Sequence, residues 1–288
     1  MRRHGIPTAE GESFEHYSEA RKFIKDSERQ RFVIKALGLA AGKGVVLAAD
    51  QKEALEALDD IMVYKKFGRE AGDHVVVEEL LDGEEISVHT FCDAHTHKTL
   101  AAGQDHKRTW EPDGPNTGWM GAYTPVDFLS EEDMKVIEHK IIKPTLGLLF
   151  ICIMMTKHGP KVIEYKARFG DPETQSMLPH LSSDTDLCQI LLACTSNALE
   201  SVKIKARSGH ACNVVVASGG YPGSAVQSSW RRALKVSVLR ALVDPISVHG
   251  VLKTAGGRVF SVAAVEDTLE EAVRTAYKGV KLIKFDGM

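Results

Sequence analysis

The longest apolar run in the chain, LGLLFICIMM at residues 146–155, is too short to cross a lipid bilayer. A membrane-spanning helix needs about 20 consecutive apolar residues, whereas a short run bounded by turn residues is typical of a buried strand. A turn at residues 158–160 separates this run from KVIEYKA, so we predict two strands, at 147–156 and 161–167. Apolar residues in such short runs must be buried in sheets and amphipathic helices.

Helix and strand signals alternate along the rest of the chain. Three helices are predicted to begin after the capping residues Asp50, Ser130 and Thr268, because each precedes an apolar pattern of helical spacing. Further predicted elements are strands on both sides of the glycine-rich turn within 32–48, a strand at 73–81, a helix at 184–200, a strand in CNVVVASGGYPG that runs into a tight turn, and a strand in TAGGRVFSVAAV. The stretch DGPNTGWMGAY, residues 113–123, is predicted to be a fixed loop that belongs to neither a helix nor a strand. The mixture indicates an α+β or α/β fold.

Length and charge narrow the class of protein. At 288 residues the chain suggests roughly two domains. Its net charge of -3 offers no excess of positive charge for nucleic acid or an anionic membrane, so we expect neither as a partner. The five cysteines are scattered without a CxxC pair, and no apolar segment follows the first arginines, so we expect a reducing, cytoplasmic location without a signal peptide.

Two stretches have residues that suit a nucleotide. In GLAAGKGV, residues 38–45, glycines let backbone N–H groups approach a phosphate and Lys43 adds charge; the alternative is a plain glycine turn, because Gly44 stands where a Walker A loop has Ser or Thr. The acidic run at 78–85 is either a solvated face or a sheet edge whose backbone contacts adenine while a carboxylate holds ribose hydroxyls.

The strand VIEYKAR has an unusual order of charges. In an extended strand, side chains two residues apart share a face, so we predict that Glu164, Lys166 and Arg168 point the same way. The ammonium then stands between a carboxylate and a guanidinium, within reach of an ion pair with Glu164.

Eight ordered motifs give the chain a family resemblance. They are RHGIPTA, KALGLAAGKGV, EELLDGEE, QDHKR, GPNTGWMGAY, KVIEYKARFGDPETQ, GGYPG and TAGGRV. Together they resemble the glycinamide ribonucleotide synthetases, or phosphoribosylamine-glycine ligases, of the ATP-grasp superfamily. The resemblance implies an α+β ATP-grasp fold with a mobile lid at 8–79, a larger half at 80–205 and a partial C-terminal domain at 206–288. The N-terminal Rossmann-like domain of the family is expected to be absent.

The resemblance also implies an activity and a set of site residues. The expected reaction joins glycine to 5-phosphoribosylamine with ATP and Mg²⁺ (or Mn²⁺), in purine biosynthesis, with other purine-pathway domains as possible fused partners. By resemblance, Lys35 and Lys43 bind the ATP phosphates, Glu85 binds the ribose, and adenine is bound by Glu78, Glu79, Leu80 and Leu81. On the same basis, Glu164 ligates the metal and Arg168 binds the acyl phosphate. The residues implied to bind substrate are Asp105, Asn116, Thr117 and Gly118.

The chain departs from the family pattern at several of these places. Lys166 replaces an asparagine metal ligand, Trp119 replaces a glycine, Leu37 replaces a small or acidic residue, and a family stretch is missing between Thr145 and Leu146. Because an ammonium offers no lone pair to a metal, we expect Lys166 not to ligate and to impair metal binding. The alternative function is therefore a non-catalytic nucleotide-binding or interaction protein derived from the ligase.

Overall fold

The fold is a mixture of antiparallel sheets and short helices, as the α+β prediction requires. The computed structural model describes residues 1–38, 44–93, 95–108, 114, 117–144, 149–223, 230–232, 239–241, 246–248, 251–254, 256–285 and 287–288. The helices are α1 (Tyr17–Asp26), α2 (Gln51–Leu58), α3 (Glu131–Ile137), α4 (Thr174–Met177), α5 (Leu187–Thr195) and α6 (Leu269–Val280). Lys43 and Asn116, both predicted site residues, lie outside the described residues.

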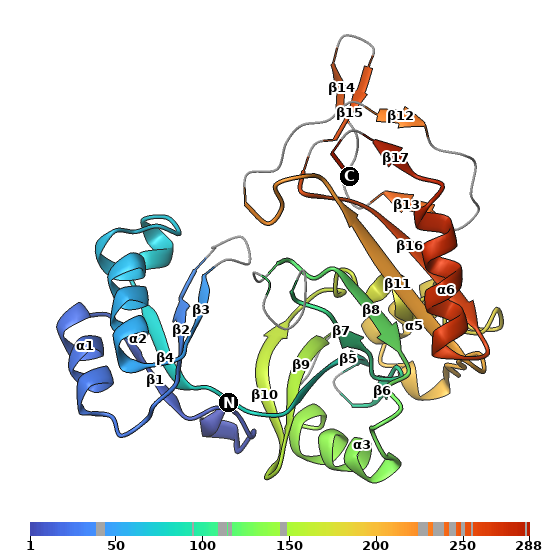
Figure 1. The fold of residues 1–288 in the computed structure, drawn as a ribbon. Helices are drawn as coiled ribbons and strands as arrows, with labels where there is room; N and C mark the ends of the chain where they lie inside the picture. Colours follow the sequence, from blue (N-terminus) through green and yellow to red (C-terminus); the bar gives the residue numbers. More distant parts are fainter. Residues whose placement is uncertain are drawn as a thin grey trace.

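The N-terminal unit is a four-stranded sheet covered by α1 and α2. Its strands are β1 (Gly11–Phe14), β2 (Phe32–Ala36), β3 (Val45–Ala48) and β4 (Val75–Glu79), in the order β1-β4-β2-β3. Both helices lie on one side of this sheet, and Figure 1 shows the unit standing apart from the rest of the chain. Its hydrophobic cluster includes Ile24, Phe32, Leu58 and Val77. The predicted cap is confirmed, because the Asp50 side chain accepts from the Glu53 amide and α2 starts there.

The middle sheet contains the two strands predicted from the apolar run. Its strands are β5 (Glu84–Cys92), β6 (His97–Thr99), β9 (Leu149–Thr156) and β10 (Gly159–Lys166), in the order β10-β9-β5-β6. The antiparallel hairpin of β9 and β10 confirms that prediction. Ile86, Ile151 and Val162 are buried in its cluster together with residues of α3 and the turn after it.

The third sheet draws strands from both sides of the boundary predicted at residue 205. Its strands are β7 (Gln104–Asp105), β8 (Gly121–Thr124), β11 (His210–Ala217), β13 (Leu239–Ala241) and β16 (Arg258–Glu266), in the order β13-β16-β11-β8-β7. Helix α6 packs against β11 and β16. Three short strands, β12 (Trp230–Arg232), β14 (Ile246–Val248) and β15 (Val251–Lys253), and the final β17 (Lys284–Phe285) complete the described elements. The domain boundaries themselves stay a prediction.

The prediction that residues 113–123 belong to no strand is wrong at its end. Gly121 begins β8, which pairs with β11 from Val214 to Ala211. A Cβ on Gly121 would lie 2.7 Å from the carbonyl oxygen of Asn213, a contact too close for any other residue. Glycine here marks a close approach of two strands, which the sequence pattern did not distinguish from a turn.

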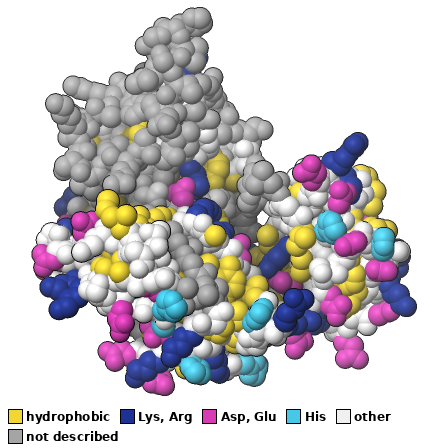
Figure 2. Space-filling model, turned by 180° about the vertical axis from the view of Figure 1, so that it is seen from behind, with side chains coloured by type: hydrophobic (Ala, Val, Ile, Leu, Met, Phe, Trp, Pro, Cys, Tyr) yellow, Lys and Arg dark blue, Asp and Glu magenta, His cyan; other side chains and the backbone are white. Residues whose placement is uncertain are grey.

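The surface of the described residues mixes the two signs of charge. In Figure 2, acidic and basic side chains alternate over the N-terminal unit and the lower part of the molecule, without a continuous basic field on the visible face. Among the helices that the structure describes, none combines the length and apolar character needed to cross a bilayer.

Candidate functional site

The site forms around the end of β10, and the register of the hairpin decides what its charged residues contact. A shift of register between Val162 and Glu164 places Glu164 opposite Cys152 and Lys166 opposite Phe150. The Cys152 thiol donates to Glu164 Oε1 at 3.5 Å, and Lys166 Nζ lies 5.1 Å from the centre of the Phe150 ring. Lys166 Nζ also lies 2.8 Å from Glu164 Oε1, which confirms the predicted ion pair.

Trp119 brings a second aromatic face to the same ammonium. Lys166 Nζ lies 4.0 Å from the centre of an indole ring of Trp119, within the range of a cation–π contact. The backbone of Trp119 has a φ of 71°, a left-handed conformation that glycine adopts without strain and a tryptophan does not. The sequence singled out Trp119 and Lys166 as separate departures, and the structure joins them in one contact.

The residues at the predicted metal position do not suit Mg²⁺. Mg²⁺ needs oxygen ligands in a near-octahedral arrangement, and the position of the second ligand on β10 holds the ammonium of Lys166. Within the described part of the chain, no group of three or more His, Cys, Asp or Glu side chains could hold a metal ion. We therefore derive no chemical step through a metal at Glu164.

Behind Lys166 lies a second ion pair, between Lys107 and Glu85. Burial opposes the charge on Lys107, but the carboxylates of Glu85 and Asp105 outweigh it and raise the pKa of Lys107. Asp105 in turn accepts from the Ser87 hydroxyl at 2.9 Å. Glu85, the predicted ribose ligand, and Asp105, a predicted substrate ligand, thus lie close to one fixed cation.

Lys35 extends from the N-terminal unit to the strand that holds Glu164. Its Nζ lies 2.6 Å from Glu78 Oε2 and donates to the carbonyl of Ile163 at 3.3 Å. The structure therefore brings Lys35, a predicted phosphate ligand, to β10, although 128 positions separate Lys35 from Ile163. Electrostatically, a cation that bridges the two units is well placed for a ligand bound between them.

The predicted adenine segment runs along the end of β4 and the connection to β5. Glu78 and Glu79 point to opposite faces of β4, because Glu78 pairs with Lys35 and Glu79 pairs with Lys161 at 2.7 Å. β4 ends at Glu79 and β5 begins at Glu84, so the half-buried Leu80 and Leu81 lie between the two sheets.

Arg168 lies beyond the strand on which its predicted orientation rests. β10 ends at Lys166, so the alternation of a strand no longer applies two residues later. The Arg168 side chain is exposed and donates to the carbonyl of Phe169 at 2.7 Å. A role for Arg168 at the acyl phosphate stays a prediction, and the side chain must turn to take it.

The loop with the predicted substrate residues is held by the strands around it. The Thr117 amide donates to the Lys107 carbonyl at 2.7 Å, and the Gly118 amide donates to the Tyr221 hydroxyl at 2.6 Å. From the C-terminal part, Arg258 also pairs with Asp171 at 3.1 Å. The GYPG motif at 220–223 and the GGRV motif at 256–259 thus contact the substrate loop and the GDPE motif at 170–173.

Two buried groups near these motifs had no predicted role. Burial raises the pKa of Glu173 from its ordinary 4.5 to about 8, and neither carboxyl oxygen has a hydrogen-bond partner in the structure. Burial lowers the pKa of His89 from 6.5 to about 3; its Nε2 accepts from the Gly170 amide at 2.8 Å. A polar residue inside the apolar strand ISVHTFC was the signal that could have identified His89.

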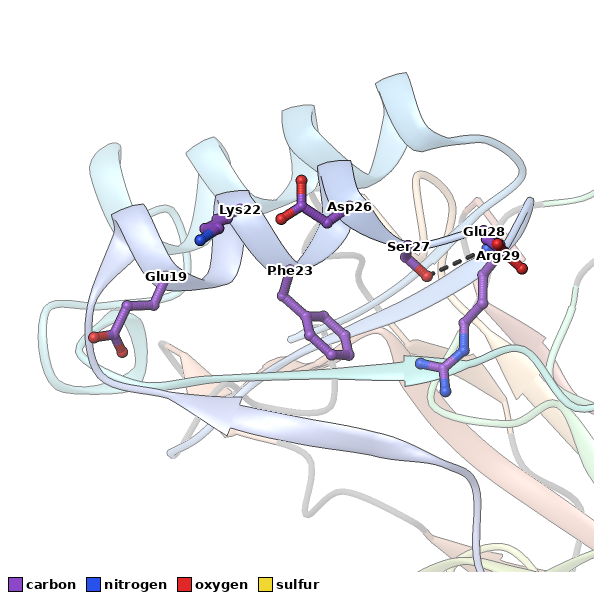
Figure 3. A pocket seen from close by; sticks show the side chains of 7 residues that line it. All are labelled: Glu19, Lys22, Phe23, Asp26, Ser27, Glu28 and Arg29. Carbon is purple, nitrogen blue, oxygen red and sulfur yellow. Dashed lines mark hydrogen bonds between the residues drawn. The ribbon is translucent and has the colours of Figure 1, made fainter.

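Hollows in the surface lie in two different places. One of about 300 Å³ is lined by Val45, Val46 and Leu47 of β3 together with Arg108 and Gly114, between the N-terminal unit and the substrate loop. A larger hollow of about 730 Å³ is lined by residues of α1 and the turn after it, and Figure 3 shows Phe23 and Arg29 beside it. None of the predicted site residues lines either hollow, but Val45, Arg108 and Gly114 of the smaller one belong to sequence motifs of the predicted site. We therefore take the smaller hollow as the cleft of the candidate site.

Comparisons with known proteins support the family resemblance. Residues 1–174 match the family model described as phosphoribosylglycinamide synthetase, ATP-grasp (A) domain, and residues 211–288 match the C domain of the same synthetase. The bifunctional purine biosynthetic protein ADE1 of Schizosaccharomyces pombe is 45% identical over 100% of this chain, which spans 38% of that protein.

The chain covers a larger share of two relatives that are named only as the ligase. The phosphoribosylamine-glycine ligase of Chlorobaculum tepidum is 41% identical, and the chain covers 71% of it. The crystal structure of the phosphoribosylamine-glycine ligase of Thermotoga maritima aligns over 100% of this chain and 74% of its own, with a TM-score of 0.82 and 28% identity. With the family model matched over residues 1–174, the chain belongs to the phosphoribosylglycinamide synthetase family and has its ATP-grasp fold.

Proposed function

We propose that the chain is an ATP-dependent ligase that joins glycine to 5-phosphoribosylamine. The observation that carries this proposal is that Lys35 reaches the Ile163 carbonyl on β10 while Lys107 pairs with Glu85 on β5 of the same sheet, in a chain of this family. Phosphoryl transfer is mainly a matter of position and charge neutralisation, and these two cations come from separate parts of the chain. The products are glycinamide ribonucleotide, ADP and phosphate, in purine biosynthesis.

The proposed reaction has two steps that use the cleft differently. The carboxylate of glycine attacks the γ-phosphorus of ATP, and ADP leaves with the pair of electrons of the broken bond. The amine of phosphoribosylamine then attacks the acyl phosphate, loses a proton and displaces phosphate. Lys35 and Lys43 stabilise the nucleotide phosphates, and Arg168 turns toward the acyl phosphate as a forked donor.

The remaining predicted residues orient the two substrates and the nucleotide. Glu78, Glu79, Leu80 and Leu81 line the connection where adenine binds, with Glu79 held in place by Lys161. Glu85 meets the ribose. In the substrate group, Asp105 lies in β7, and the Lys107 carbonyl and the Tyr221 hydroxyl hold Thr117 and Gly118. Asn116, outside the described residues, has a substrate role in the proposal as well.

A second candidate is a nucleotide-binding protein that does not catalyse the reaction. The specific observation in its favour is the ion pair of Lys166 with Glu164, because it engages the carboxylate that the family uses for metal. Both candidates bind ATP in the same cleft, so they differ only in turnover.

A turnover assay with a matched pair of variants tests the proposal. The release of ADP should require both glycine and phosphoribosylamine. Lys35→Met should lower the turnover at least about tenfold, whereas Lys52→Met, which removes an exposed lysine paired only with Glu56 on α2, should not change it. ATP binding without turnover moves the conclusion to the second candidate. A folded chain that binds no ATP contradicts both.

The relatives also suggest which other enzymes this chain associates with. The Schizosaccharomyces pombe relative is a bifunctional purine biosynthetic protein, and we propose that this chain acts beside or within other purine enzymes in the cytoplasm. Co-purification of a second purine-pathway activity from the cytosolic fraction of the source cells tests this, and its absence there contradicts it.

A further inference from the structure

Lys166 is enclosed in a way that an ordinary surface lysine is not. Its side chain is 16% exposed, with Glu164 Oε1 at 2.8 Å and the rings of Trp119 and Phe150 at 4.0 and 5.1 Å from Nζ. The carboxylate and the two ring faces all present negative potential to the ammonium. These contacts come from β10, β9 and the substrate loop, so three separate segments of the chain hold one charge.

We propose that Lys166 is a tethered cation that takes the place of a divalent metal at this position, so that the nucleotide binds here without Mg²⁺. The proposal rests on the proposed function in one respect only, that ATP binds in this cleft. The ligand is the polyphosphate chain of a nucleoside triphosphate, and the lysine supplies the positive charge that a metal supplies elsewhere.

The position of the ammonium leaves no room for a metal on the same carboxylate oxygen. Glu164 Oε1 already receives the Cys152 thiol at 3.5 Å and the ammonium at 2.8 Å. A bound Mg²⁺ would sit about 2.1 Å from that oxygen, close to a fixed positive charge in a half-buried environment where like charges repel strongly. The metal must then either displace Lys166 from both rings or bind elsewhere.

Trp119 helps to hold the Lys166 ammonium in place. Its φ of 71° places a bulky side chain in a conformation suited to glycine, and its indole is the nearer of the two rings to the ammonium. We infer that the indole holds the lysine against Glu164. A change at either residue should therefore alter the effect of a change at the other.

The test measures ATP affinity by calorimetry in EDTA and in Mg²⁺, on the full chain. For the parent chain, the two dissociation constants should differ by less than about tenfold. Lys166→Asn should weaken binding in EDTA and raise the ratio above about tenfold. Lys166→Arg, which keeps the charge, should retain the parental ratio. The control Lys135→Asn removes an exposed lysine paired with Glu132 on α3 and should also behave as the parent.

Each outcome of the calorimetry either supports or overturns the tethered cation. A parental ratio above tenfold, or an Lys166→Asn ratio that stays flat in a folded sample, overturns the tethered cation. Failure of every variant and the parent to bind ATP under either condition contradicts the proposed function instead. If Lys166→Asn does not fold, the Lys166→Arg and Trp119→Leu variants decide: the first should keep the parental ratio and the second should raise it, and the reverse overturns the proposal.

Discussion

Two lysine–glutamate pairs lie beside the same cleft, and their surroundings differ. Lys35 pairs with Glu78 across neighbouring strands of the N-terminal unit and has a second acceptor in the Ile163 carbonyl. Lys166 pairs with Glu164 along one strand, and its other neighbours are ring faces. The first lysine can exchange oxygen acceptors with an arriving phosphate, whereas the second must leave two rings to do so. The same two residue types thus give one cation that can turn toward a phosphate and one that stays fixed and acts on the phosphates through its charge.

The largest expected effect comes from removing a ring on the Lys166 side. Phe150→Ala should destabilise the fold by about 3–5 kcal/mol, because Phe150 is 1% exposed and a cavity remains. It should also weaken ATP binding in EDTA. Phe32→Ala in the N-terminal unit removes an equally buried ring and should destabilise by a similar amount, but without changing the dependence of ATP binding on Mg²⁺. Urea unfolding and calorimetry measure both effects, and a metal dependence that follows Phe32 equally contradicts the comparison.

Glu173 differs from both paired glutamates, because its buried carboxyl oxygens have no hydrogen-bond partner in the structure. The pKa of Glu173 is about 8 when folded and near 4.5 when unfolded, so the folded chain holds the proton that the unfolded chain releases. Its contribution to stability is present below pH 4.5 and is lost as the pH rises toward 8. Glu173→Gln should therefore gain stability over the parent between pH 5 and 8, by on the order of 3 kcal/mol. Parallel unfolding curves at pH 5 and 8 check this, and a difference that shrinks with rising pH contradicts it.

Removing the acid from each ion pair compares the two lysines directly. Glu164→Gln removes the ion-pair partner of Lys166 and leaves only a neutral amide oxygen beside its buried Nζ. This should cost about 2 kcal/mol, since partial exposure of Glu164 screens the pair. Glu78→Gln leaves Lys35 bonded to Ile163 and should cost about 1 kcal/mol or less. Thermal unfolding of both variants at one pH and salt concentration measures the difference. Equal losses would show that the rings make no difference to the lysine.

The smallest expected effect is the direct coupling of Trp119 and Lys166. A double-mutant cycle of Trp119→Leu and Lys166→Met should give a coupling free energy of about 1 kcal/mol, as a partly desolvated cation–π contact does. The matched cycle uses Phe23→Leu and Arg29→Met, whose guanidinium lies 5.9 Å from the Phe23 ring centre. That longer contact should couple by less. A larger value for the Phe23 cycle contradicts the importance given to Trp119.

Local rules predicted the elements well because their causes lie within a few residues. Asp50, Ser130 and Thr268 each accept a hydrogen bond from the amide three positions later, and a helix follows in every case. The Glu164–Lys166 pair follows from the two-residue period of a strand. Such features need no knowledge of the rest of the chain.

The site could be predicted only in part because its contacts span the chain. Nothing near Trp119 in the sequence indicates that Lys166 lies over its ring, since the two residues are far apart in the chain and meet only in the folded structure. The strand ends two residues before Arg168, so the two-residue period does not fix the direction of that side chain. Glu173 lay within a quoted motif, but its burial is a property of the assembled sheets. The roles of the site residues stay predictions.

The left-handed backbone at Trp119 has a consequence for how this site can change in evolution. A single substitution Lys166→Asn would offer a second oxygen to a metal but would leave a strained indole facing a neutral amide. Trp119→Gly alone would relax the backbone but leave the ammonium with one ring and one carboxylate. Neither single change gives the glycine and asparagine pair of the family pattern, so we expect the two positions to be exchanged together.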